Sequence, residues 1–579
     1  MNSPKRHSLF ALLTLVAALA IGCEDDKGPN PAPTATVSVL TPVPAPDGLL
    51  GEIFMPAPEA TWVKARGAVG GAMSLLPQTF GGLVTTLVGL PITSSTEVDG
   101  DIAVLGAIVD TPGQPQPRAA IGIHVKGGDR VLTQATKGDS PRFTARVDKA
   151  TNITLLDPKG AKGPVALGIL GNYLLVAQDE ESLLTIGPYV ARTMPSSTNL
   201  PKDDVTIDVP ERALSGSIHT NLKTGWERVS GRERTSAIQP LVDVDAVMDS
   251  ALAVIADLAR ARVSINLVGG AVRTRLAMTP KAGDGAASRM AREMAVGDAE
   301  RLLDLPADTL VALMWRDRSE ARGAAATARA GAIAGLVGKD IPEKDKEMLA
   351  AALAAAAEAR GDWFVGGLSL GPTGPAGYGR GAVKDEEKLE KALKGLFAAS
   401  KLPSVKSRLA TAKLAVSSGK LVVEDVPGDV HRLKLSRIED KPTRNKKVGP
   451  PPPGLSPGGE IPASIELLAR LGKEQFLLAA GYDAREALKA LIAAGERDNL
   501  RGVDSIKETV GSLGGEVAFA LVVEPLRIVA SRAGKPGAAE SAPVMLAWGT
   551  EKESKETIWA RLDLANVAVR ELVKRRGAF

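Results

Sequence analysis

Two stretches of the chain, GDIAVLGAIV at residues 100–109 and GDWFVGGL at residues 361–368, share one plan: a glycine, an acidic residue and then an apolar run. A third stretch, GEVAFALVV at residues 515–523, has the same plan. Each is short, rich in β-branched or small residues and bounded by glycine or proline, which is typical of a buried strand. These strands guide the interpretation of the remaining chain, because similar segments follow each of them.

A second strand and then a helix are expected after each of the three stretches. Turns rich in proline and glycine separate the paired strands. The expected second strands are residues 119–125, 379–383 and 544–548, and the expected helices are residues 129–136, 385–399 and 552–573. Strand, turn, strand, helix is therefore the predicted recurring unit.

Two further similarities indicate an internal duplication. Residues 170–177 and 471–480 both have the pattern of a strand that leads into a helix. The segment PAPEAT at residues 56–61 is similar to LPADTL at residues 305–310. The order of these segments is kept at a period of roughly 250 residues, which is the length of a domain and not of a solenoid repeat.

These patterns predict an α+β fold of two similar modules, each a mainly antiparallel sheet covered by alanine-rich helices. We place the modules at residues 51–280 and 281–579. The first ends with a helical segment at 241–261 and a β-hairpin around Gly269-Gly270. A basic, proline-rich insertion near residues 441–459 interrupts the second module, and is expected to be a solvated loop or a polyproline segment that binds a partner.

The composition excludes several classes of function. The 579 residues are 44% hydrophobic and 24% charged, as in an ordinary globular chain. The formal net charge of +4 gives no electrostatic reason to bind nucleic acid. Aromatic residues make up only 3% of the chain, which argues against ring platforms for single-stranded nucleic acid or sugars.

The N-terminus has the pattern of an export signal. Lys5 and Arg6 precede an uncharged apolar run of 14 residues, Leu9 to Gly22. Such a run is too short for a typical spanning helix and suits the core of a signal peptide. The alternative, an uncleaved membrane anchor, would need a longer apolar run.

The sequence Ala20-Ile21-Gly22-Cys23 resembles the lipobox of bacterial lipoproteins. The resemblance implies that residues 1–22 are a cleaved signal peptide and that Cys23 carries acyl chains that anchor the protein to an envelope membrane, inner or outer. Cys23 is the only cysteine, so the exported chain makes no internal disulfide. Residues 23–50 contain six prolines and are predicted to be a semi-rigid tether.

The body of the chain is similar to uncharacterised families of exported bacterial proteins with duplicated α/β modules. The motifs that carry this resemblance are LPADTL at 305–310, GNYLLV at 171–176 and GGE at 514–516. The resemblance implies no reaction, no cofactor and no catalytic residue.

The residue patterns of common catalytic and metal sites are absent or misplaced. His7, His124, His219 and His431 are far apart, so they have no metal-ligand spacing. Gly367-Leu368-Ser369-Leu370-Gly371 matches G-x-S-x-G, but Pro372 follows directly and excludes the helix that a nucleophilic serine requires. We therefore predict no metal, no cofactor and no catalytic serine.

Three carboxylates recur at the starts of the glycine-acid strands: Asp101, Asp362 and Glu516. They are interpreted as turn residues that satisfy local backbone donors, the alternative being an acid–base or cation-binding set. Residues 67–92 contain no charged side chain. This segment is expected to be a pair of small-residue helices packed on the sheet, the alternative being a hairpin that dips into lipid.

The favoured function is a non-enzymatic binding or scaffold role for a lipid-anchored envelope protein, facing the periplasm or the cell surface. A carrier of lipid or another apolar ligand is the second hypothesis, and an envelope hydrolase that uses unidentified carboxylates is the third. The expected partners are the membrane, through the N-terminal lipid, and an envelope protein or apolar ligand, but no nucleic acid.

Overall fold

The computed structural model of the chain describes most of residues 40–571. The residues outside the description are 1–39, 70–75, 112–115, 138–140, 161–164, 197–199, 234–243, 269, 321, 323–341, 372–373, 412, 439–463, 514–515, 536–539, 555, 569 and 572–579. Cys23 with its lipobox and the insertion near 441–459 lie outside the described residues, so what the sequence indicates for them stays a prediction.

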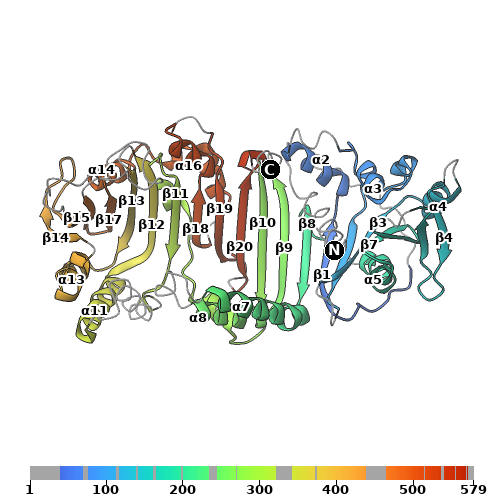
Figure 1. The fold of residues 1–579 in the computed structure, drawn as a ribbon, viewed down its shortest axis with the longest axis horizontal. Helices are drawn as coiled ribbons and strands as arrows, with labels where there is room; N and C mark the ends of the chain where they lie inside the picture. Colours follow the sequence, from blue (N-terminus) through green and yellow to red (C-terminus); the bar gives the residue numbers. More distant parts are fainter. Residues whose placement is uncertain are drawn as a thin grey trace, which may run out of the picture. The chain divides into compact units, whose positions relative to one another are not determined.

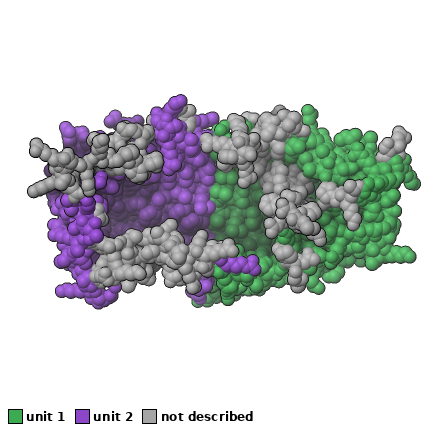
Figure 2. Space-filling model, in the orientation of Figure 1, with its two compact units in different colours: residues 1–227, 251–288, 559–579 green, residues 228–250, 289–558 purple. Residues whose placement is uncertain are grey.

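The described chain has the predicted α+β fold, and its strands pair antiparallel. It divides into two compact units (Figure 2). Unit 1 contains residues 1–227, 251–288 and 559–579, and unit 2 contains residues 228–250 and 289–558. The C-terminal segment thus belongs to the same unit as the first strand of the chain.

Unit 1 is built on an antiparallel sheet in the order β4-β5-β6-β7-β3-β2-β1-β8-β9-β10-β20 (Figure 1). Its strands are β1 (Leu49–Met55), β2 (Val104–Val109), β3 (Arg118–His124), β4 (Phe143–Val147), β5 (Thr154–Pro158), β6 (Ala166–Leu170), β7 (Tyr173–Ala177), β8 (Val205–Pro210), β9 (Leu258–Val268), β10 (Ala271–Pro280) and β20 (Ile558–Ala565). Its helices include α2 (Pro58–Val69), α3 (Phe80–Val88), the 3₁₀ helix η3 (Ile92–Thr96), α4 (Gly128–Lys137) and α5 (Glu180–Arg192). Helices α7 (His219–Glu233), α8 (Val244–Ala256) and α9 (Ala286–Glu293) each include residues of both units.

Unit 2 has a sheet in the order β14-β15-β16-β17-β13-β12-β11-β18-β19. Its strands are β11 (Val311–Arg316), β12 (Arg360–Gly371), β13 (Gly374–Val383), β14 (Leu414–Leu421), β15 (Val430–Arg437), β16 (Ser464–Arg470), β17 (Gln475–Gly481), β18 (Val517–Val523) and β19 (Val544–Thr550). Its helices include the alanine-rich α11 (Glu343–Ala359), α12 (Glu386–Ala399), α13 (Pro403–Thr411), α14 (Ala484–Ala493), α15 (Asp504–Gly511) and α16 (Pro525–Arg532).

The two sheets have the same topology. In unit 1, β2 pairs with β1 and β3, β3 pairs with β7, and β1 pairs with β8. In unit 2, β12 pairs with β11 and β13, β13 pairs with β17, and β11 pairs with β18. The prediction of two similar antiparallel modules is therefore confirmed at the level of fold.

The details of the predicted repeat need two corrections. Residues 517–523 of the stretch 515–523 form β18, which pairs with β11 and β19 and so corresponds to β8, not to β2 or β12. The other two stretches do correspond, but the strand pairings align Gly106 with Gly366 and not Gly100 with Gly361. This shift of one residue matters because successive side chains of a strand point to opposite faces.

The helix predicted at residues 552–573 is wrong over its central part, which forms β20 (Ile558–Ala565). Alanine, leucine and arginine favour a helix, yet Ala560, Leu562 and Leu564 alternate with Arg561 and Asp563, which is a period of two residues. The predicted hairpin around Gly269-Gly270 is confirmed by the pairing of β9 with β10.

Helices cover both faces of the central strands of unit 1. On one face, Trp62 of α2, Phe80 of α3 and Val131 of α4 pack into a core with the strands. On the other face, Leu183 and Val190 of α5 belong to a second core. Among the residues that the structure describes, no helix has the length and apolar character needed to cross a bilayer.

Candidate apolar binding site

Helix α3 lies on the first of these faces and is held at both ends by its own sequence. The Thr79 hydroxyl oxygen accepts a hydrogen bond from the Gly82 amide, and the Glu59 carboxylate accepts one from the Phe80 amide at 2.9 Å. A carboxylate at this end is favourable, because the first amides of a helix carry positive partial charge. Gly89 ends the helix with φ 74°, a backbone conformation that glycine adopts without strain.

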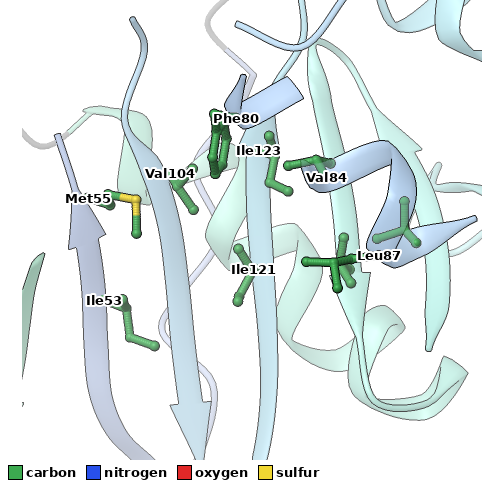
Figure 3. A pocket seen from close by; sticks show the side chains of 10 residues that line it. Ile53, Met55, Phe80, Val84, Leu87, Val104, Ile121 and Ile123 are labelled. Carbon is green, nitrogen blue, oxygen red and sulfur yellow. The ribbon is translucent and has the colours of Figure 1, made fainter. Parts of the chain in front are cut away.

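A pocket opens between α3 and the strands beneath it (Figure 3). The helix contributes four apolar side chains, and four strands contribute six more. The lining residues are Ile53 and Met55 of β1, Val104 of β2, Ile121 and Ile123 of β3, Val176 of β7, and Phe80, Val84, Leu87 and Val88 of α3. Every lining side chain is apolar, and the cavity volume is about 30 Å³.

The chemistry of this pocket favours apolar groups over water. Its volume exceeds the roughly 10–15 Å³ that one water needs, but a water also needs two or more polar partners. The lining side chains offer none. Leu87 is 45% exposed, so the pocket reaches the surface at the end of α3. The site can therefore accept a methyl group or the end of an alkyl chain at little desolvation cost.

The same sheet face exists in unit 2, where ring side chains replace part of the aliphatic surface. In unit 1, Ile53 pairs with Gly106, Gly106 with Ile121, and Ile121 with Val176. The corresponding row in unit 2 is Leu313, Gly366, Gly379 and Leu478. By the same pairing, Trp315 and Phe364 take the positions of Met55 and Val104.

A row of aromatic side chains crosses six strands on this face of unit 2. In the order of pairing its six positions are Phe476, Gly381, Phe364, Trp315, Phe519 and Trp548, and all but Gly381 are aromatic. The ring centroids of Trp315 and Phe364 are 4.4 Å apart, and those of Phe519 and Trp548 are 3.9 Å apart, both pairs stacked. The chain thus gathers five of its few aromatic residues at one place.

Glycines make room for these rings. A Cβ added at Gly379 would collide with the ring of Phe364, and one added at Gly381 would lie 2.6 Å from the ring of Phe476. On the same face, Leu368 and Leu546 are 39% and 38% exposed. The face is apolar and partly open.

The residues that the sequence suggested for catalysis do not form a site. Ser369 lies inside β12, not at a turn before a helix. Asp101, Asp362 and Glu516 stand before β2, near the start of β12 and before β18. No cluster of three or more His, Cys, Asp or Glu side chains within the described residues could hold a metal ion. His124 contacts Asp99, with Nδ1 and Oδ2 3.2 Å apart.

One buried acid was not anticipated from the sequence. Glu524, at the end of β18, is 1% exposed; its carboxylate accepts hydrogen bonds from the Ser541 hydroxyl at 2.6 Å and the Ala542 amide at 3.0 Å. Burial raises the pKa of Glu524 above its usual range, although both hydrogen bonds oppose the shift. Glu524 is far in sequence from every residue that lines the pocket under α3. A single glutamate after a predicted strand is common, so the sequence alone does not predict that it is buried.

The pocket residues were also missed, but a signal for them exists. Phe80, Val84, Leu87 and Val88 follow the spacing of one helix face within the charge-free segment 67–92. Residues 80–88 confirm the expected helix packed on the sheet for that part of the segment.

No protein-family model matches the chain, and no curated protein matches it either. Among solved structures, crystal forms IV and III of TP0453 are similar to part of it, at 10% and 9% sequence identity. The matches cover 40% and 44% of this chain and 77% and 85% of that protein, with TM-scores of 0.20 and 0.21. At TM-scores this low, nothing said of this chain rests on them.

Proposed function

We propose that this protein is a lipid-anchored, non-enzymatic binding protein of the bacterial cell envelope, and that the pocket under α3 takes the apolar part of its ligand. The observation that carries the proposal is the lining of that pocket, which is apolar at all ten positions and open to the surface beside Leu87. An enzyme pocket places polar groups around the reacting atoms, whereas a hydrocarbon site does not need them.

The envelope location is supported by the lipobox-like sequence. If Cys23 is acylated, the predicted tether connects the lipid to unit 1. Leu40 and Val43, at the start of the described chain, pack against the core under α5. The Val43 amide donates to the Thr193 hydroxyl at 2.9 Å, and that hydroxyl donates to the Val43 carbonyl at 2.6 Å. The described chain is therefore held against unit 1 from its first residues on.

A ligand longer than the end of an alkyl chain requires α3 to move away from the sheet. The cavity of about 30 Å³ holds only a small apolar group while α3 stays in place. The helix has nine residues and is bounded by the Thr79 cap and Gly89, so an outward movement breaks few hydrogen bonds. We expect binding of an acyl chain to lift α3 and to replace its contacts with ligand contacts.

A fluorescent fatty acid tests this function. The wild-type chain is expected to bind the probe, and Val88→Phe, which fills the pocket from α3, should weaken binding about tenfold, equivalent to about 1.4 kcal/mol. Val63→Phe is the matched control, because Val63 is an exposed helical valine of the same unit outside the pocket. If the wild-type chain binds no probe, or if both variants weaken binding equally, the proposal is wrong.

A protein-binding scaffold is the second candidate, and the open apolar face of unit 2 favours it. Exposed leucines beside stacked rings are typical of surfaces that bind other proteins. Leu546→Asp should then release proteins that copurify with the lipidated chain from envelope extracts. If the same proteins are recovered with Leu546→Asp, this face is not their docking surface.

A further inference from the structure

The corner of unit 1 where α3 meets η3 presents apolar side chains to solvent. Leu87, near the end of α3, is 45% exposed, and Ile92, the first residue of η3, is 67% exposed. Four residues lie between them in sequence, and Gly89 turns the chain there. Exposed aliphatic side chains of this size are costly in water when they are grouped.

Charge is distributed around this corner in a distinct way. The 26 residues from 67 to 92 contain no charged side chain. Arginines stand at the two ends of α3: Arg142 donates to the Gly89 carbonyl at 3.3 Å, and Arg66 donates to the Gln78 carbonyl at 3.4 Å. Arg142 is exposed and its acceptor is neutral, so its guanidinium charge stays available to an anionic surface at this corner, whereas Arg66 is half-buried at the other end of α3.

We propose that this corner docks on the surface of an anionic phospholipid bilayer. Leu87 and Ile92 enter the boundary between headgroups and acyl chains, and Arg142 meets the lipid phosphates. Apolar side chains that enter the interface and a cationic side chain that meets the phosphates both contribute to binding an anionic membrane surface. The contact is interfacial, which agrees with the absence of a spanning helix in the described part of the chain.

The predicted acylation of Cys23 favours a bilayer over a protein as the occupant of this corner. Seventeen residue steps separate Cys23 from Leu40. An extended chain covers about 3.5 Å per residue, so acylation of Cys23 keeps unit 1 within about 60 Å of the membrane. This step rests on the proposed function; the exposed leucine and isoleucine and Arg142 do not.

Docking in this orientation gives the pocket a source of ligand. Leu87 both lines the pocket and belongs to the docking corner. The open end of the pocket therefore faces the lipid in the docked state, and an acyl chain passes from the bilayer to the sheet without crossing water.

Vesicle binding tests the proposal on the mature chain with Cys23→Ser, which removes any contribution of an acyl anchor. The vesicles contain equal parts of phosphatidylcholine and phosphatidylglycerol. We expect the protein to sediment with them, Ile92→Asp to lower the partition coefficient about tenfold, and Arg142→Gln to lower it about fivefold. Val422→Asp is the control, since Val422 is an 80% exposed valine of unit 2.

Ile92→Trp keeps the test independent of folding defects, because it should strengthen partition where Ile92→Asp weakens it. The proposal is overturned if the parent chain does not sediment with these vesicles, if neutral vesicles bind it equally well, or if Val422→Asp loses as much binding as Ile92→Asp. Fatty-acid titration without vesicles separates the two proposals: Ile92→Asp should bind the probe like the parent chain, so loss of vesicle binding with intact probe binding concerns the docking corner alone.

Discussion

Two equivalent sheet faces, one in each unit, solve the same packing problem with different residues. In unit 1, Ile121 fills the centre of the face, and the apolar helix α3 covers it. In unit 2 the corresponding position is Gly379, and the ring of Phe364 lies against it. One copy has long aliphatic side chains at the centre of the face, and the other has glycines beside aromatic rings. Helices pack on both faces, since residues of α11 and α12 form a core with Phe364 and Phe476. A duplicated sheet thus keeps its topology and its apolar character while the side chains at its centre change.

The difference has a physical consequence for binding. The face in unit 1 is closed except for a small pocket, so a ligand must enter between helix and sheet. The face in unit 2 leaves Leu368 and Leu546 partly exposed, so a partner can contact it directly. We expect the first to select hydrocarbon chains and the second to contact larger surfaces.

The largest loss of stability is expected when Ile121 of unit 1 is replaced by glycine, the residue at the corresponding position of unit 2. Ile121→Gly removes a buried side chain and adds backbone freedom, which should lower the free energy of unfolding by about 3–5 kcal/mol. Hydrogen exchange measured on peptides of each unit would locate the loss, since a two-unit chain need not unfold in one step. Faster exchange confined to β1, β2 and β3 supports the account; unchanged exchange there contradicts it.

The reverse substitution, which gives unit 2 the isoleucine of unit 1, should lower the free energy of unfolding by less. Gly379→Ile drives a branched side chain into the ring of Phe364, and overpacking of this kind costs about 1–3 kcal/mol. The double variant Gly379→Ile with Phe364→Val restores the composition of unit 1 at both positions, so it should recover part of the lost stability in urea unfolding. No recovery would show that Phe364 is not the group displaced.

A smaller effect is expected from the aromatic row. Phe519→Leu removes the stack with Trp548 but keeps an apolar side chain, so it should cost about 0.5–1.5 kcal/mol. The fluorescence of Trp548 should change with it, because the ring beside the indole is replaced. Phe143 is the control, because it is a buried ring of unit 1 without a stacked partner in the described contacts. If Phe143→Leu lowers the free energy of unfolding as much as Phe519→Leu does, the aromatic row has no special role.

The smallest effect concerns pH. The pKa of Glu524 is raised in the folded chain, so folding favours its protonated form, and its contribution to stability is present at acid pH and is lost as pH rises through the raised pKa. In unit 1 the residue directly after the corresponding strand, β8, is Glu211, which is exposed and not buried as Glu524 is. Hydrogen exchange is compared with the intrinsic exchange rate at each pH, which gives the protection of each amide. Glu524→Gln should reduce the loss of protection in unit 2 as pH rises and leave the protection in unit 1 unchanged. If protection in unit 2 depends on pH in the same way in Glu524→Gln and in the parent chain, Glu524 does not contribute to the pH dependence of stability.

The sequence predicted topology better than register. Periodicity and repeated motifs identified the strands around 100–109 and 361–368 and the hairpin at Gly269-Gly270. The glycine-acid motif misaligned the repeat by one residue, because a turn motif does not define which side chain faces the core. Helix-forming residues concealed the strand β20, where a buried Arg561–Asp563 pair takes the place of apolar residues.

The candidate site could be predicted only in part. The segment 67–92 indicated the helix that covers the pocket, because it contains no charged side chain that would need to face solvent. The aromatic row was not foreseeable from a content of 3% aromatic residues, because composition does not record that Trp315, Phe364 and Phe519 meet across adjacent strands. Lateral pairing of distant segments is what the structure adds.

Photolabelling with a fatty acid that carries a diazirine near its methyl end would locate the bound chain in the protein. We expect covalent labels on α3 and on the strand β3 beneath it, reduced by excess unlabelled fatty acid and by Val88→Phe but not by Val63→Phe. Labels confined to unit 2, or labels in unit 1 that excess fatty acid does not reduce, would contradict the assignment of the pocket under α3 as a site for apolar chains.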